Sequence, residues 1–128
     1  MQKVLVVIDM QNDFVDGALG STQAQMIVDN VRKKIESFDG PIIFTRDTHG
    51  IDYLEHQEGK MLPVPHCVKN TEGWHIVKGL IEAAEGRPIM SPVSFIDKPN
   101  FGSLELLSRL EGMNSVNPIE SITLVGLC

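Results

Sequence analysis

The chain has 128 residues, of which 42% are hydrophobic and 22% are charged, as in an ordinary globular domain. Its 11 basic and 17 acidic residues give a formal charge of −6 without any block of like charge, so nothing indicates nucleic acid or an anionic membrane as a partner. Two cysteines make no disulfide framework, and no stretch approaches the roughly 20 apolar residues of a membrane span. We therefore expect one domain over residues 1–128, in a reduced, cytoplasmic protein, for which a small-molecule or a cationic partner stays possible.

The first third of the chain predicts a strand, a helix and a second strand. Residues 3–9 are a β-branched run that ends in a carboxylate, as a central parallel strand does at the edge of its sheet. Ser21 can cap a helix through about Phe38, because apolar residues recur there every three or four positions. Residues 41–47 form the second strand, which also ends in an acid.

The rest of the chain continues this alternation after a long irregular segment. Residues 48–74 are rich in Gly, Pro, His and charge, and a loop of this length indicates a candidate site. A helix over 75–85, a strand over 92–98, a helix over 102–111 and a last strand over 120–127 follow. The last strand is apolar enough to be buried on both faces. Strands that alternate with helices predict an α/β fold with a parallel sheet sandwiched by helices.

Several polar residues follow the predicted carboxyl ends of the strands, where ligands of open parallel sheets bind. Asp9 follows the first strand and Lys98 ends the third, so the fold would bring a carboxylate and an ammonium together. Such a pair can transfer a proton, but Asp9 alone can also be a capping residue, and the pair can be a structural salt bridge. Cys128 stands at the end of the fourth strand, at the same edge.

The end of the second strand and the irregular segment after it carry a second group of candidate residues. Asp47 and His49 are two positions apart in TRDTHG, so their side chains point the same way on an extended segment, and PVPHC adds His66. Two imidazoles and one carboxylate suit a catalytic Zn²⁺, Fe²⁺ or Mn²⁺, although a chance group of solvated histidines is the alternative. His56 is a candidate fourth ligand.

Taken together, these stretches resemble the nicotinamidase and isochorismatase-like cysteine hydrolases. The matching motifs are VLVVIDMQNDF, TRDTHG, LPVPHC, DKPNFGS and LVGLC, which run the length of the chain. The D-x-H and P-H-C pair is similar to the metal-binding nicotinamidase branch of that family. The resemblance implies a Rossmann-like, three-layer α/β/α fold with six parallel strands and a metal-dependent amidohydrolase that converts nicotinamide to nicotinate and ammonia.

The resemblance also implies roles for five of the candidate residues. Asp9 would take the proton of a nucleophilic cysteine, and Lys98 would support the thiolate. Asp47, His49 and His66 would hold a divalent metal that binds the pyridine nitrogen of nicotinamide.

Three more residues are placed near the substrate by the same resemblance. Phe14 would form a wall of the ring pocket, and Phe101 stands where many members carry Tyr. The catalytic cysteine would lie four residues beyond Cys128, whose backbone N–H would then donate to the oxyanion. We thus expect residues 1–128 to be a truncated domain that lacks the nucleophile and the last strands and helices.

Two other functions fit parts of the sequence. Another hydrolase of the family could act on a ureido or carbamoyl amide or on a vinyl ether, but isochorismatases generally lack the metal ligands. A receiver-like phosphoacceptor signalling module also alternates strands with helices, but there the Lys follows the last strand, whereas Lys98 precedes a further helix and strand. A homo-oligomer stays open, because the sequence has no interface signature.

Overall fold

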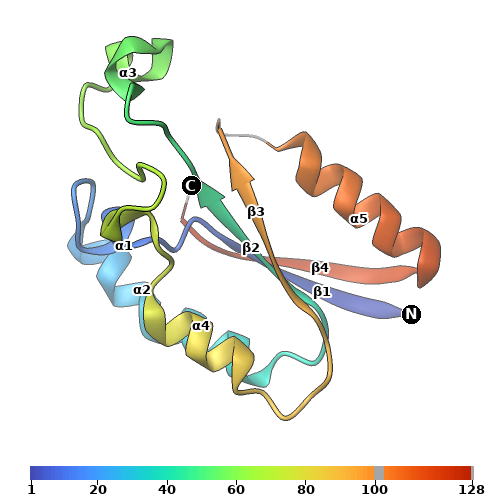
Figure 1. The fold of residues 1–128 in the computed structure, drawn as a ribbon. Helices are drawn as coiled ribbons and strands as arrows, with labels where there is room; N and C mark the ends of the chain where they lie inside the picture. The colour runs from blue at the N-terminus through green and yellow to red at the C-terminus, as the bar shows by residue number, and fades with distance from the viewer. Residues whose placement is uncertain (100–102, 128) are drawn as a thin grey trace.

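The computed structural model describes residues 1–99 and 103–127 and shows a parallel sheet with helices on both faces (Figure 1). The strand order is β3-β2-β1-β4, and every neighbouring pair is parallel. The strands of the described residues are β1 (Gln2–Ile8), β2 (Ile42–Asp47), β3 (Val93–Lys98) and β4 (Ile119–Gly126). This topology confirms the predicted Rossmann-like α/β fold.

The three predicted helices are present, two of them with different bounds, whereas the helical turns after the first strand and within residues 48–74 were not predicted. In the described residues they are α1 (Asn12–Val15), α2 (Thr22–Ser37), α3 (Gln57–Met61), α4 (Lys78–Glu85) and α5 (Leu104–Val116), with short 3-10 helices η1 (Tyr53–Glu55) and η2 (Glu72–Trp74). The Ser21 hydroxyl accepts a hydrogen bond from the Ala24 N–H, so the predicted cap of α2 is confirmed. Helix α4 begins later than predicted, and α5 extends to Val116 after its own cap at Ser103.

The two faces of the sheet build two separate parts of the core. Val4 and Val6 of β1 pack on the face that α5 covers, whereas Leu5 and Val7 pack on the face that α2 and α4 cover. All four side chains are completely buried, because successive residues of a central strand point to opposite, covered faces. No helix in the described part of the chain has the length and apolar character that crossing a membrane requires.

Strand β4 differs from its prediction as a strand buried on both faces. The side chains of Ile122 and Leu124 are 45% and 62% exposed. Strand β4 lies at the edge of the described sheet and pairs there with β1, whereas the buried residues under α5 come from the other three strands, Val4 and Val6 of β1, Ile43 of β2 and Ile96 of β3. The apolar run thus predicted the strand correctly but not its burial, because burial depends on which strand lies at the edge.

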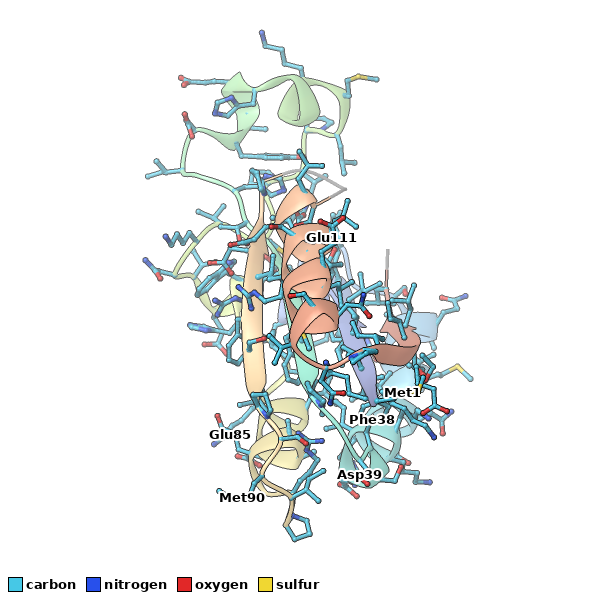
Figure 2. The ribbon with its side chains drawn as sticks, turned by 90° about the vertical axis from the view of Figure 1, so that its right-hand side faces the viewer. Met1, Phe38, Asp39, Glu85, Met90 and Glu111 are labelled. Carbon is cyan, nitrogen blue, oxygen red and sulfur yellow. The ribbon has the colours of Figure 1, made fainter. Side chains whose placement is uncertain are left out.

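Buried Arg87 forms hydrogen bonds at the end of the molecule that lies away from the irregular segment. In Figure 2, α5 with Glu111 lies in front of the sheet, and Phe38 and Met90 lie at the opposite end from α3. At that end Nη1 of Arg87 donates to the carbonyls of Phe38 and Gly40, at 2.8 Å each. These carbonyls belong to the turn that follows α2, so Arg87 ties α4 to that turn.

Candidate active site

The first polar cluster joins the carboxyl ends of three strands. Lys98, the last residue of β3, extends past β2 and donates from Nζ to Oδ2 of Asp9 at 2.7 Å. The hydroxyl of Thr45, on β2, donates to Oδ1 of the same carboxylate at 2.7 Å. The side chains of Asp9 and Lys98 are only 3% and 6% exposed. The structure thus brings the two predicted residues into a buried, hydrogen-bonded ion pair.

Asp9 itself has an unusual backbone conformation. Its φ of 50° lies in the left-handed region, where a residue other than glycine costs of order 1–2 kcal/mol and which Asp tolerates better than most. Its N–H donates to the carbonyl and to Oγ1 of Thr45, at 3.2 Å each. The Thr45 hydroxyl therefore accepts from the Asp9 backbone and donates to the Asp9 side chain, which orients the carboxylate. The sequence analysis did not identify Thr45. A hydroxyl residue inside an otherwise apolar strand was the only feature of the sequence that could have indicated it.

The second cluster consists of Asp47, His49 and His66, whose ligand atoms all lie within 4.8 Å of one another. Oδ2 of Asp47 is 3.0 Å from Nε2 of His49 and 3.4 Å from Nε2 of His66. Nδ1 of His66 is 2.8 Å from the carbonyl of Val64, to which it can donate, and this contact orients Nε2 toward the cluster. One carboxylate oxygen and two ring nitrogens, all buried, are a donor set that fits a divalent transition metal.

The loop that carries His66 is fastened to both neighbouring segments. The His49 N–H donates to the carbonyl of Cys67 at 3.0 Å, and the Cys67 N–H donates to Oδ2 of Asp13 at 2.8 Å. Cys67 has a φ of 48°, and the chain bends there, directly after His66. Asp13, which the sequence did not single out, holds the turn from the segment that follows β1.

Aromatic rings line one side of the metal-ligand cluster. The ring of Tyr53 lies 4.7 Å from that of His49 and 5.1 Å from that of His66, between centroids. The Tyr53 hydroxyl donates to the Leu62 carbonyl at 2.8 Å. The Phe14 ring is 5.4 Å from that of His66, which is compatible with the predicted wall. Tyr53 was not predicted, because only the folded loop turns it inward.

Other candidate residues lie apart from the cluster or outside the described residues. The His56 side chain is 65% exposed and its Nε2 is 3.0 Å from Oδ2 of Asp52, so it does not join the three metal-ligand candidates. Burial raises the pKa of the Cys67 thiol, and the nearby carboxylate of Asp47 raises it further. Cys67 therefore stays protonated at neutral pH and is a poor nucleophile. Phe101 and Cys128 lie outside the described residues.

Comparisons with known proteins agree with this geometry. The isochorismatase domain model matches residues 3–128. The pyrazinamidase/nicotinamidase of Streptococcus mutans is 28% identical, with a TM-score of 0.77 over 98% of this chain and 72% of that chain. The nicotinamidase/pyrazinamidase of Bacillus subtilis is 30% identical, with a TM-score of 0.73 over 100% of this chain and 72% of that chain.

A third solved structure bears on the metal. It is the pyrazinamidase of Pyrococcus horikoshii in complex with zinc, which is 27% identical, with a TM-score of 0.70 over 100% of this chain and 72% of that chain. No curated protein matches this chain. All three structural matches therefore span nearly the whole of this chain.

Proposed function

Because the chain belongs to the isochorismatase family and is a hydrolase, we propose that it acts as a metal-dependent cysteine amidohydrolase that converts nicotinamide to nicotinate and ammonia. The family match confirms the resemblance drawn from the motifs and excludes the receiver-like signalling module. The names of the three similar structures, nicotinamidases and pyrazinamidases, support an amide as the substrate. A ureido or carbamoyl amide is the alternative substrate within the same family.

The observation that carries the proposal is the pair of polar clusters at one sheet edge. Asp47 ends β2 and Lys98 ends β3 beside it, so the metal-ligand candidates lie next to the ion pair of Lys98 with Asp9. The zinc complex of the Pyrococcus horikoshii enzyme supports a divalent metal held by Asp47, His49 and His66. Such a metal would supply a Lewis acid and a coordination position for a substrate atom.

In this proposal Asp9 moves the proton. The nucleophile would be the cysteine that the family motif implies four residues after Cys128, since burial raises the pKa of Cys67 and makes its thiol a poor nucleophile. Asp9 accepts the thiol proton, and the thiolate forms a bond to the amide carbon. As the carbon–nitrogen bond breaks, Asp9 returns the proton to the leaving ammonia, and water then hydrolyses the thioester. Oδ2 of Asp9 accepts from Lys98 and Oδ1 accepts from Thr45. Each oxygen has a second lone pair, which can take the thiol proton.

The remaining predicted residues would bind the substrate. Phe14, beside the His66 ring, would cover one side of an aromatic ring, and Tyr53 would keep both imidazoles in place. Phe101 and the backbone N–H of Cys128 keep their proposed roles as a pocket residue and an oxyanion donor.

Ammonia release by the full-length protein tests the proposal. We expect release from nicotinamide after loading with Zn²⁺, Fe²⁺ or Mn²⁺, its loss after chelation, and its return when the metal is added back. Asp47→Asn, which keeps the side-chain shape but removes the charge, should prevent metal binding and activity. If the loaded protein released ammonia from carbamoyl amides but not from nicotinamide, the substrate assignment would be wrong. Release that is insensitive to chelation would contradict the role of the metal.

A further inference from the structure

The turn after β1 contains a buried glutamine that the proposed chemistry does not use. The Gln11 residue is completely buried. Its Oε1 accepts from the Asp47 N–H at 2.8 Å, and its Nε2 donates to the carbonyls of Asp47 and Trp74, also at 2.8 Å each. One side-chain amide therefore binds both backbone polar groups of Asp47.

This arrangement follows from the way in which β1 ends. The Leu5 N–H donates to the Pro41 carbonyl and the Asp9 N–H to the Thr45 carbonyl, so the ladder between the strands advances in equal steps. The left-handed conformation of Asp9 then turns the chain away from β2. On the edge of β2 that faces β1, the backbone groups of Asp47 are the next that need hydrogen-bond partners.

The side chain of Gln11 takes the place of the missing strand backbone. A primary amide offers one acceptor and two donors, so it can bind a residue's N–H and C=O as a neighbouring strand would. A buried backbone group without a partner costs about 1–3 kcal/mol, so this replacement keeps the end of β2 extended up to Asp47.

We propose that Gln11 is a positioning residue for the metal ligand Asp47. Its two bonds hold the peptide groups on both sides of the Asp47 Cα, which sets the direction in which the carboxylate points. On the other side of β2, the Thr48 N–H donates to the Lys98 carbonyl at 2.8 Å, so the segment is held from both edges. The bond to Trp74 connects the same amide to η2. This inference depends on the proposed function, in which Asp47 binds the metal.

The test compares metal affinity and stability in the full-length protein. Gln11→Met keeps the length of the side chain and removes all three hydrogen bonds. Loss of such a supporting residue is expected to weaken metal binding by about 10–100-fold, measured by competition titration with Zn²⁺. The electronic spectrum of bound Co²⁺ should also change, because the carboxylate is no longer held in one direction. The control is Val31→Ala, on the buried face of α2, which should lower the melting temperature and leave the Zn²⁺ affinity unchanged.

A second measurement needs no variant. In the unsubstituted protein, both side-chain amide protons of Gln11 should exchange slowly, and their NMR signals should shift when Zn²⁺ binds, whereas those of the exposed Gln23 and Gln25 should do neither. Equal Zn²⁺ affinity in Gln11→Met and the unsubstituted protein would overturn the inference, and so would fast exchange of the Gln11 protons. If the unsubstituted protein bound no Zn²⁺, or if Asp47→Asn bound it equally well, the metal part of the proposed function would fail as well.

Discussion

Replacement of Lys98 by Met should strongly destabilise the protein, because it leaves a buried carboxylate without its cation. The bond from Lys98 to Asp9 is 2.7 Å long, and the two side chains are 6% and 3% exposed, so water screens the pair very little. Breaking a buried pair of this kind costs about 3–5 kcal/mol, whereas loss of an exposed pair costs about 0–1 kcal/mol. Thr45 would remain as a donor to the carboxylate, so we expect a cost in the lower half of the range of about 3–5 kcal/mol for buried pairs.

Urea unfolding of four proteins measures this effect. The set consists of the unsubstituted protein, Lys98→Met, Asp9→Asn and the double variant, with the free energy of unfolding obtained by linear extrapolation. We expect the double variant to be at least about 2 kcal/mol more stable than the sum of the single effects implies, because it contains no unpaired buried charge. A cost below about 1 kcal/mol for Lys98→Met, or additive single effects, would refute the assignment of a desolvated pair.

Three further perturbations test other parts of the structure. Thr45→Val removes the donor to Oδ1 of Asp9 and should cost about 1.5–3 kcal/mol of stability and most of the ammonia release, whereas Thr45→Ser should restore both; equal effects of the two would contradict the role of the hydroxyl. Cys67 should resist alkylation in the folded protein at pH 8 and react in urea. Since burial raises its pKa above the ordinary 9.0, the unfolded state loses this proton first, and stability should fall as the pH rises above 9.0. Cys67→Ala should remove that part of the slope, and an unchanged slope would count against the burial argument. Arg87→Met leaves the carbonyls of the turn after α2 without their donor and should lower the free energy of unfolding by about 2–4 kcal/mol without changing Zn²⁺ affinity; a changed affinity would show that the two ends of the molecule are coupled.

The elements that the sequence predicted best are those whose apolar pattern is long. All four strands and helix α2 lie within one residue of their predicted bounds, because each strand has a continuous apolar run and α2 has a periodic apolar face. Helix α1 has four residues, which is too short for any period to be recognised. The extension of α5 to Val116 was not predicted. No residue of α5 is fully buried, so the helix does not need a strong periodic pattern of apolar residues along its whole length.

The supporting residues of the candidate site were missed for a different reason. Thr45, Gln11 and Asp13 act through hydrogen bonds to residues at least 36 positions away in the chain. No local pattern contains such a pairing, because it depends on which strands become neighbours and where the chain turns. The metal-ligand candidates were easier to find, since Asp47 and His49 are close in sequence and His66 has a proline-rich setting.

The sequence by itself determined the alternation of strands and helices, the acids at the ends of two strands and the three residues that could bind a metal, because each depends on residue type and local spacing. Only the tertiary structure decided which of these residues meet. The order β3-β2-β1-β4 places one strand between Lys98 and Asp9, and the long side chain of Lys98 spans it. The folded loop directs Tyr53 toward the metal-ligand candidates and leaves His56 in solvent. Burial then gives these contacts their strength, since an ion pair that is weak in water becomes costly to break once the sheet and its loops exclude water from it.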